Sequence, residues 1–317
     1  MELRNARVLV TGGAGFVGGH LVRELRARGA TEVIVPRRRD YDLLEGAAAR
    51  RLLADARPDL VVHLAGRIGG IGANRDNPAV FLYENLMMGL QLLEECRLHG
   101  VAKVVTVGSV CAYPKLTPIP FREEDLWNGY PEETNAPYGL AKRMLLAQGQ
   151  AYRAQHGMNV VHLVPANLYG PGDHFDTASS HVIPALIGKV QRALDRGDAA
   201  VEAWGTGAAS REFLYVEDAA RGLCMAAATF DGPEPVNLGT GVEIRIAELA
   251  ALLASLMGFT GEIRFDARMP DGQPHRRLDT SRAETLFGFR ATTTLEDGLR
   301  RTIDWYRSRR AGSSLDR

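Results

Sequence analysis

Cysteines, metal-binding patterns and long apolar runs are all scarce in this sequence. Its 317 residues include three cysteines, Cys96, Cys111 and Cys224, which lack the paired spacing of a zinc site or a disulfide framework. The eight histidines show no metal-binding spacing either, so we expect no metal. No apolar stretch reaches the roughly 18 residues of a membrane-spanning helix, and the polar residues 1–7 do not resemble a signal peptide. We therefore expect a cytoplasmic protein with free thiols and no membrane partner.

An excess of one charge is missing too. Basic and acidic residues balance at 38 each, which leaves no overall positive field to attract nucleic acid or a membrane surface. Hydrophobic residues make up 45% of the chain, an ordinary share for a globular protein. At this length the chain can form one large domain or a pair of coupled domains.

Apolar runs alternate with helical patterns in the first half of the chain. The runs that resemble strands are 7–10, 32–35, 60–64, 101–107 and 160–164. The helix-like stretches between them are 19–28, 45–56, 78–99 and 137–156. This alternation predicts an α/β protein with a Rossmann-type, doubly wound parallel sheet that is covered by helices on both faces.

The rhythm changes after Gly172. A stretch rich in His, Ser, Ala and Gly follows, and the later part of the chain has mostly helical patterns. We expect residues 1–172, with a return segment at 213–239, to form the Rossmann domain. Residues 173–212 and 240–317 would then form a smaller, discontinuous α/β lobe that binds the substrate.

Glycines follow the first apolar run at a regular spacing. Gly12, Gly15 and Gly18 lie three apart, and Gly13, Gly15 and Gly18 satisfy the pattern GxGxxG. Between a strand and a helix, such glycines let backbone N–H groups approach a pyrophosphate at the helix N-terminus. We therefore expect a dinucleotide cofactor to bind along Gly12, Gly13, Ala14, Gly15, Phe16, Val17 and Gly18.

Basic residues follow the second apolar run. An acidic residue there would bind a ribose hydroxyl and favour NAD. This chain instead has Arg37, Arg38 and Arg39 after Pro36, and guanidinium groups suit a 2′-phosphate. The run therefore favours NADP(H), although three arginines can also form a solvated surface turn.

Ser109, Tyr138 and Lys142 have the pattern of a carbonyl-reducing site. Tyr138 and Lys142 are four residues apart and share one face of a helix. There the ammonium group would lower the phenol pKa, so that the phenol can transfer a proton near neutral pH. Ser109 can hydrogen-bond the reacting oxygen. The three residues predict reduction or oxidation of a carbonyl beside a nicotinamide.

Cys111 and His181 are not needed for reduction alone. Cys111 comes two residues after Ser109, and a thiol near a cation can become a thiolate that accepts a proton. His181 begins a helix-like segment. The pair suggests a second kind of proton chemistry in the same pocket. Taken singly, a buried cysteine is more often a small inert hydrophobe, and a lone histidine is more often a surface or core residue.

Several blocks of the sequence resemble the GDP-L-fucose synthases, a family of extended short-chain dehydrogenases/reductases. They are AGRIGGIGAN at 65–74, CAYPK at 111–115, PANLYGP at 165–171, SHVIPAL at 180–186, WGTG at 204–207, REF at 211–213, NLGTG at 237–241 and PDG at 270–272. The resemblance covers nearly the whole chain. It implies that GDP-4-keto-6-deoxy-D-mannose is converted to GDP-L-fucose, by epimerisation at C3 and C5 followed by reduction of the C4 ketone with NADPH.

The resemblance also implies roles for individual residues. Cys111 would be the base of the epimerisation and His181 the acid that reprotonates the opposite face. Ser109 and Tyr138 would stabilise the developing oxyanion, and Tyr138 would protonate the C4 oxygen as hydride arrives. The residues implied around the cofactor are Arg38, Ala65, Val107, Gly108, Lys142, Pro165, Asn167, Leu168 and His181. Those implied at the GDP-sugar are Lys189, Trp204, Arg211 and Asp271.

Departures on the substrate side leave alternatives open. Lys189 stands where the family carries an arginine, and His275-Arg276 replaces an Arg-Lys pair. They motivate the same chemistry on a related 4-keto-deoxy nucleotide sugar of the colitose type. A plain 4-ketoreductase or a 4-epimerase is a further alternative, but a 4-epimerase has no use for Cys111. A non-catalytic NADP-binding protein would usually lack a member of the Ser/Tyr/Lys set.

A homodimer is also implied by the resemblance. In the family, helices equivalent to 78–99 and 137–156 form a four-helix interface between subunits. The apolar side chains on these helices that we expect there are Phe81, Leu82, Leu86, Met87, Leu90, Leu145 and Leu146. The alternative is that these faces only pack on the sheet.

Overall fold

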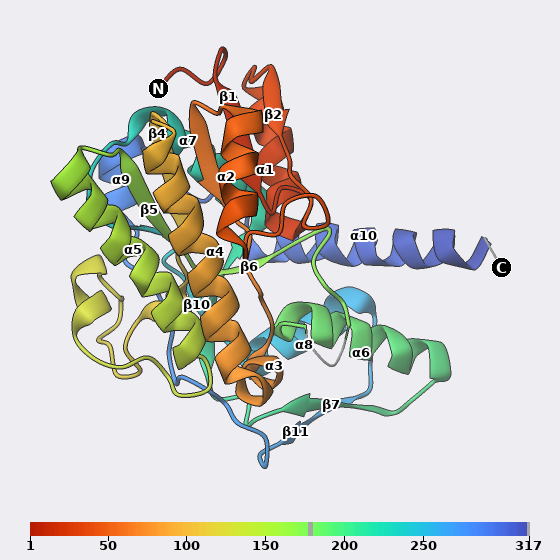
Figure 1. The fold of residues 1–317 in the computed structure, drawn as a ribbon. Helices are drawn as coiled ribbons and strands as arrows, with labels where there is room; N and C mark the ends of the chain where they lie inside the picture. Colours follow the sequence, from red (N-terminus) through yellow and green to blue (C-terminus); the bar gives the residue numbers. More distant parts are fainter. Residues whose placement is uncertain (177–179, 316–317) are drawn as a thin grey trace.

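A six-stranded, wholly parallel sheet organises the larger part of the molecule (Figure 1). The computed structural model describes residues 1–176 and 180–315, with side chains to Ala311. The sheet has the order β2-β1-β3-β4-β5-β9. Its strands are β1 (Arg7–Thr11), β2 (Glu32–Ile34), β3 (Leu60–His63), β4 (Lys103–Val107), β5 (Val160–Pro165) and β9 (Val236–Leu238).

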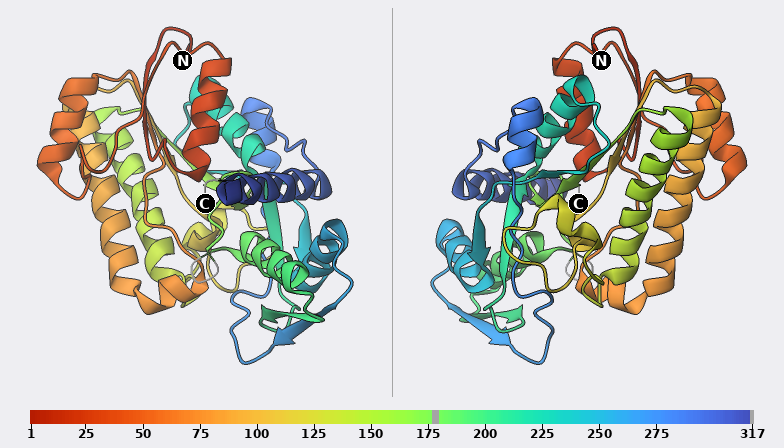
Figure 2. Two further views of the ribbon diagram at one scale, coloured as in Figure 1. Left: turned by 90° about the vertical axis from the view of Figure 1, so that its right-hand side faces the viewer. Right: turned by 90° about the vertical axis from the view of Figure 1, so that its left-hand side faces the viewer.

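Helices cover both faces of this sheet (Figure 2). On one face lie α2 (Gly46–Ala56), α4 (Pro78–Leu98) and α5 (Ala136–His156), and on the other α1 (Phe16–Ala27) and α7 (Val216–Thr229). Because both faces are covered, the central strands β3 and β5 are buried along their whole length. The predicted doubly wound α/β fold is confirmed.

Two small sheets build the rest of the structure. One has the order β10-β8-β6, formed by β6 (Asn167–Tyr169), β8 (Ser210–Tyr215) and β10 (Glu243–Arg245), and the other pairs β7 (Ala200–Trp204) with β11 (Glu262–Asp266). Around them pack α6 (Val182–Arg196), α8 (Ile246–Met257) and α10 (Leu295–Leu315), whose C-terminal half extends away from the body in Figure 1. Shorter helices are α3 (Ile71–Asp76), η1 (Val110–Ala112), η2 (Glu123–Trp127) and α9 (Ser281–Phe287).

The chain crosses between the two parts more than once. Within the return segment 213–239, β9 joins the large sheet beside β5 and α7 packs against α1. The strand β8 ends directly before α7 begins, and it pairs with β6 in a small sheet. These crossings bring β8 and the segment after β11 next to the carboxyl ends of β4 and β5, where an open α/β sheet binds its ligands. In the described part of the chain, no helix is long and apolar enough to span a membrane.

Candidate active site

The loop between β1 and α1 is packed too tightly for side chains at its glycines. Gly12 has a positive φ of 71°, and a Cβ there would lie 2.8 Å from the backbone nitrogen of Ala65. A Cβ on Gly18 would overlap the carbonyl oxygen of Gly12 and lie 2.5 Å from Gly13 Cα. The first turn of α1 therefore rests directly on the loop, and its N-terminus has no side-chain cap. Such a turn fits the diphosphate of a dinucleotide.

Arg38 follows the segment that lies against this loop. Val35, the residue directly after β2, is in contact distance of Gly13, since a Cβ on Gly13 would lie 2.9 Å from it. Arg38 follows three residues later with an exposed side chain, whose Nε lies 3.1 Å from the Asp42 carboxylate. An exposed ion pair of this kind contributes little stability, so Arg38 is available for a phosphate.

The remaining predicted cofactor residues lie at the carboxyl ends of the central strands. Val107 ends β4 and Gly108 follows it, and the Gly108 N–H donates to Leu163 O on β5 at 2.7 Å. Pro165 ends β5, followed by Asn167 and Leu168 in β6. The crevice beyond these ends is where the fold places a dinucleotide.

Close packing of α5 on η1 brings the predicted catalytic residues together. Gly139 lies against the carbonyl group of Cys111, with no room for a Cβ. Its neighbour Tyr138 can therefore hydrogen-bond with Ser109. One turn further along α5, Lys142 Nζ lies 5.7 Å from the centre of the Tyr138 ring. The structure thus brings Ser109, Tyr138 and Lys142 close together.

The expected lowering of the Tyr138 pKa is wrong. Burial raises the pKa of Tyr138 well above its ordinary value, the electrostatic interaction with Cys111 raises it further, and the hydrogen bond with Ser109 offsets only part of this. Burial also lowers the pKa of Lys142 to about 8. Tyr138 is therefore a neutral phenol at neutral pH, and a neutral phenol is the proton donor that reduction of a ketone requires.

A row of buried polar residues beneath Lys142 was not found from the sequence. Thr11, His63, Thr106 and His162 are neighbours in register across β1, β3, β4 and β5. Thr11 Oγ lies 2.8 Å from His63 Nδ1, and Thr106 Oγ lies 2.8 Å from His162 Nδ1. Burial and then the charge of Lys142 lower the pKa of both histidines to about 3, so both stay neutral. Their signal in the sequence was a polar residue near the end of each apolar run.

Cys111 is in contact with a cation that the sequence marked only as a departure from the family pattern. Nη1 of Arg276 lies 3.3 Å from Cys111 Sγ. Arg276 comes from the segment after β11, and its side chain is buried. The two residues are 165 positions apart, so no local pattern could have paired them.

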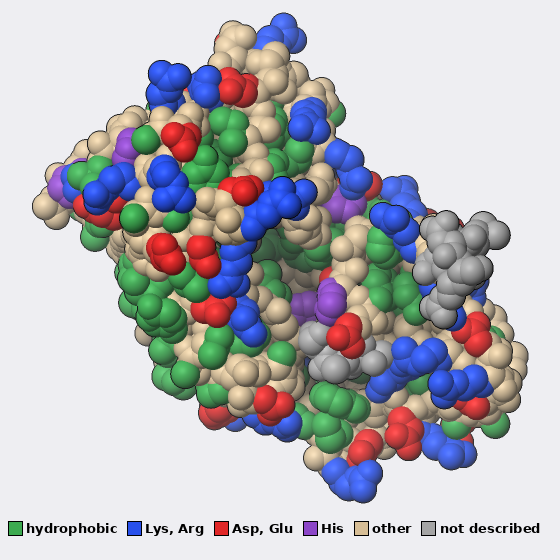
Figure 3. Space-filling view, turned by 45° about the vertical axis from the view of Figure 1, so that its right-hand side comes forward, with side chains coloured by type: hydrophobic (Ala, Val, Ile, Leu, Met, Phe, Trp, Pro, Cys, Tyr) green, Lys and Arg blue, Asp and Glu red, His purple; other side chains and the backbone are tan. Residues whose placement is uncertain are grey.

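His181 is the N-cap residue of α6, and it also interacts electrostatically with Arg276. Its side chain reaches solvent, yet the surrounding protein partly desolvates it and lowers its pKa; the positive charges of Arg276 and His174 lower it further. A space-filling view shows the surface hollowed between the two parts of the molecule, with histidine and basic side chains around the hollow (Figure 3).

The residues expected at the substrate lie across from this group. Arg211, on β8, donates to the carbonyl oxygens of Ser210 and Asp271 at 2.7 and 2.8 Å, and burial lowers its pKa to about 9. The Asp271 carboxylate accepts the Thr206 N–H at 2.7 Å. Trp204 ends β7 half-exposed, with Lys189 Nζ 5.9 Å from its ring centre.

These substrate residues also approach the Gly-rich segment 65–74. A Cβ on Gly72 would lie 3.8 Å from the Trp204 ring. A Cβ on Gly66 would lie 2.8 Å from Oδ1 of the buried Asn85 and 3.8 Å from Lys142 Nζ. The segment therefore lies between the Trp204 indole and Lys142.

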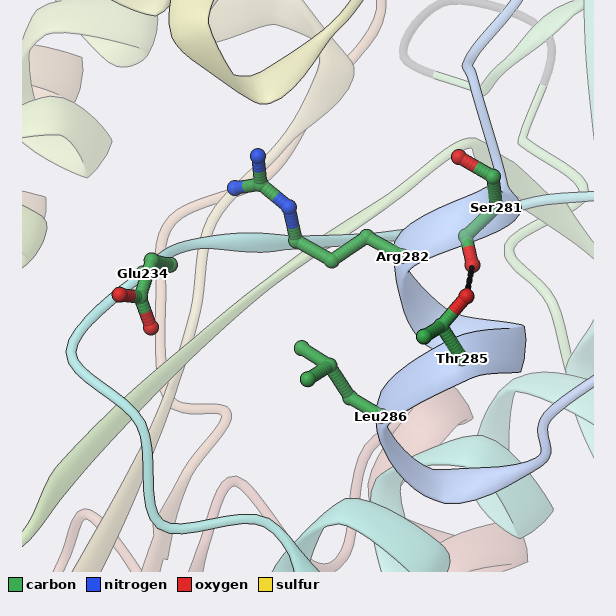
Figure 4. A pocket seen from close by; sticks show the side chains of 5 residues that line it. All are labelled: Glu234, Ser281, Arg282, Thr285 and Leu286. Carbon is green, nitrogen blue, oxygen red and sulfur yellow. Dashed lines mark hydrogen bonds between the residues drawn. The ribbon is translucent and has the colours of Figure 1, made fainter.

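A surface pocket lies elsewhere on the molecule (Figure 4). It is lined by Glu234, Ser281, Arg282, Thr285 and Leu286. Arg282 already donates to the carbonyl oxygen of Pro235 at 3.0 Å and pairs with Glu124. The pocket contains none of the predicted residues. Among residues 1–176 and 180–315, no cluster of three or more His, Cys, Asp or Glu side chains could hold a metal.

Fold and site together define a nicotinamide-dependent enzyme of the extended short-chain dehydrogenase/reductase class. A family model described as the NAD dependent epimerase/dehydratase family matches residues 8–239. The chain belongs to this family and, within it, to the group that contains the GDP-L-fucose synthases.

Similar proteins support this placement. GDP-L-fucose synthase 1 of Arabidopsis thaliana is 38% identical over 306 residues, which cover 96% of this chain and 94% of the relative. GDP-L-colitose synthase of Yersinia pseudotuberculosis is 34% identical, covering 95% and 97%. Among solved structures, a GDP-L-fucose synthetase from Naegleria fowleri bound to NADP has a TM-score of 0.86 at 28% identity, covering 96% of this chain and 94% of that one. A GDP-6-OMe-4-keto-L-xylo-heptose reductase from C. jejuni has a TM-score of 0.91 at 28% identity, covering 96% and 99%.

Proposed function

We propose that this protein converts GDP-4-keto-6-deoxy-D-mannose to GDP-L-fucose, by epimerisation at C3 and C5 and NADPH-dependent reduction at C4. The observation that carries the proposal is the grouping of Cys111 and His181 around Arg276, beside Ser109, Tyr138 and Lys142. A plain ketoreductase needs only the last three. The relatives named as GDP-L-fucose synthases give the substrate.

Its cofactor is NADP(H), which supplies the hydride when bound. The loop from Gly12 to Gly18 would hold the diphosphate, since it has no room for side chains at its glycines. Arg38 would meet the 2′-phosphate. The residues Ala65, Val107, Gly108, Lys142, Pro165, Asn167, Leu168 and His181 would surround the remainder of the cofactor.

Epimerisation begins with loss of a proton from a carbon next to the C4 ketone. Cys111, as thiolate, accepts that proton, while Ser109 and Tyr138 donate hydrogen bonds to the oxygen on which negative charge develops. His181 then protonates the opposite face. Because its pKa is lowered, the imidazolium of His181 is a stronger acid than usual and transfers its proton more readily.

Reduction uses the same oxygen. As hydride reaches C4, the alkoxide that forms is a stronger base than a phenolate. The neutral phenol of Tyr138 can therefore protonate it in spite of its raised pKa. Both steps can run at one site because the ketone oxygen keeps the same two hydrogen-bond donors throughout.

The nucleotide would bind across the hollow from the reacting sugar. The positive charge of Arg211 can pair with the diphosphate. The remainder of the GDP-sugar site would be lined by Lys189, Trp204 and Asp271. The half-exposed Trp204 offers an aromatic face. Residues 173–212 and 240–317 would thus form a substrate lobe, and residues 1–172 with 213–239 the cofactor domain.

A related substrate is the second candidate. The GDP-L-colitose synthase relative is similar over almost the whole chain. Lys189 donates to the Glu202 carbonyl oxygen at 2.9 Å and keeps a single point charge where an arginine would present a fork. The relative and this departure from the family arginine together motivate the second candidate.

A homodimer in the cytoplasm is the assembly we propose. On α4, Leu82 and Tyr83 are exposed, and Leu86, Met87 and Leu90 are partly buried. Phe81, Leu145 and Leu146 are instead buried within the subunit, so they cannot contribute to the interface as expected. Beside them, Gly89 lets α5 approach α4 closely. The two helices form one outer face of the molecule (Figure 2), suited to pairing with a second copy.

The test is turnover of GDP-4-keto-6-deoxy-D-mannose with NADPH in deuterated water, followed by NMR of the product. Deuterium at both C3 and C5 of GDP-L-fucose is the expected result. Reduction without deuterium would mean a plain 4-ketoreductase. No NADPH oxidation with this substrate, but turnover of another 4-keto nucleotide sugar, would establish the second candidate.

A further inference from the structure

A buried arginine in contact with the Cys111 sulfur has no role in the reaction described above. Nη1 of Arg276 lies 3.3 Å from Sγ, and the arginine side chain is 6% exposed. Throughout residues 1–176 and 180–315, no carboxylate lies within ion-pair distance of Arg276. A buried guanidinium without an anionic partner is unfavourable. The Cys111 sulfur is therefore the group whose negative charge the guanidinium can stabilise.

Hydrogen bonds that do not involve the sulfur fix Arg276 in place. Its Nε donates to Oε1 of Gln273 at 2.9 Å. The side-chain amide of Gln273 donates in turn to the carbonyl oxygens of Pro114 and Lys115, both at 3.0 Å. Gln273 is 1% exposed. Because Pro114 and Lys115 follow Cys111 closely in the chain, this arrangement joins the arginine segment to the cysteine loop before any substrate binds.

Three other titratable groups are coupled to this pair. Arg211, from β8, interacts electrostatically with Cys111, but its guanidinium donates to the carbonyl oxygens described above, which leaves the direct contact to Arg276. Tyr138, from α5, is neutral at neutral pH. His181, from the start of α6, is coupled to Arg276. The two arginines, Arg211 and Arg276, both favour a negative charge on the Cys111 sulfur.

The two remaining cysteines show the effect of burial without such a cation. Cys96 and Cys224 are both 0% exposed, and neither has a hydrogen bond from a basic side chain within the described residues. Burial raises the pKa of both thiols, that of Cys224 to about 12. They therefore remain thiols, and Cys111 differs from them by its contact with Arg276.

We propose that Arg276 is a positioning residue that holds the Cys111 sulfur in place and stabilises its thiolate form for proton abstraction. In that step the proton passes from carbon to sulfur, and the electron pair of the broken C–H bond enters the enolate that ends at the ketone oxygen. A proton from His181 then forms the new C–H bond on the other face. The use of the thiolate in epimerisation rests on the proposed function, whereas the pairing of Arg276 with Cys111 does not.

The pairing can be tested on the enzyme without substrate. The rate of Cys111 alkylation by iodoacetamide is measured across a pH series, with the site identified by peptide mass spectrometry. We expect Arg276→Gln to move the midpoint of this profile upward by about one pH unit or more. Arg276→Met, which keeps the apolar stem, should give the same shift and serves if the glutamine variant does not fold. Arg268→Gln, which removes an exposed arginine paired with Asp266, is the matched control and should leave the midpoint unchanged.

Turnover supplies the second readout. In Arg276→Gln, deuterium entry at C3 and C5 should slow at least tenfold at neutral pH, and the deficit should shrink as the pH rises and the thiol ionises. An unchanged alkylation midpoint in a folded variant overturns the proposal. A raised KM for the GDP-sugar with an unchanged midpoint overturns it as well, because Arg276 would then be a diphosphate ligand. A shifted midpoint in an enzyme that does not turn over the GDP-sugar would support the pairing and refute the proposed function.

Discussion

Lys142→Met should stabilise the unliganded protein while it abolishes the chemistry. Burial lowers the pKa of Lys142 from 10.5 to about 8. At about 1.4 kcal/mol per pH unit, that difference corresponds to roughly 3 kcal/mol of destabilisation. This cost is present in full below pH 8, where the lysine is charged in both the folded and the unfolded chain. It fades as the pH rises from about 8 towards 10.5, because the folded protein loses its proton first.

Urea unfolding at neutral pH and again near pH 10, at one protein concentration, measures this effect. The free energy of unfolding of Lys142→Met should exceed that of the wild type by about 2–3 kcal/mol at pH 7, and this difference should narrow at the higher pH. Lys103→Met is the control, because the buried Lys103 also has a pKa lowered by burial but donates to Ala226 O, Phe230 O and Asp231. Loss of those bonds should destabilise the fold. A Lys142→Met protein no more stable than the wild type at pH 7 would refute the reasoning.

Four further predictions test the site and the assembly. Tyr138→Phe removes the proton donor, so NADPH oxidation should fall about 10²- to 10⁴-fold while deuterium exchange into the substrate persists; equal loss of both would contradict this. Arg38→Ser should weaken NADPH binding about tenfold or more, as measured by fluorescence titration, and leave NADH binding unchanged. Gly18→Ala places a methyl group against the loop and should lower cofactor affinity and thermal stability, whereas Gly19→Ala, with nothing within 4 Å, should not. Leu82→Asp should give a monomeric mass in sedimentation at micromolar concentration; a persistent dimer would place the interface elsewhere.

The large sheet and much of the site could be predicted from local pattern. Parallel strands covered on both faces need continuous apolar runs, which is why the predicted segment 160–164 coincides with β5 almost residue for residue. Tyr138 and Lys142 share a helix, so their spacing alone fixes their relation. The glycine loop was predictable because tight packing excludes side chains at Gly12 and Gly18, and that requirement is visible in the residue type itself.

What could not be predicted depends on contacts between distant segments. The pKa of Tyr138 is set by burial, and a sequence does not give the depth at which a phenol lies. The Thr–His row requires four strands in register, and the pairing of β8 with β6 requires the path of the intervening chain. Arg276 was visible only as a departure from a pattern, because its partner lies 165 residues away.

Three buried basic side chains make this site electropositive. Lys142, Arg211 and Arg276 are each less than a tenth exposed, and in the described part of the chain none forms an ion pair with a carboxylate. Such charges are costly to bury alone, as the lowered pKa values of Lys142 and Arg211 indicate. The anions that can offset this cost are those of the reaction: the diphosphate of the substrate, the thiolate, and the oxygen that becomes negative at C4. These cations destabilise the protein while the site is empty, and they gain anionic partners when the charges of the transition state appear. The site therefore stabilises the transition state more than it stabilises the resting protein.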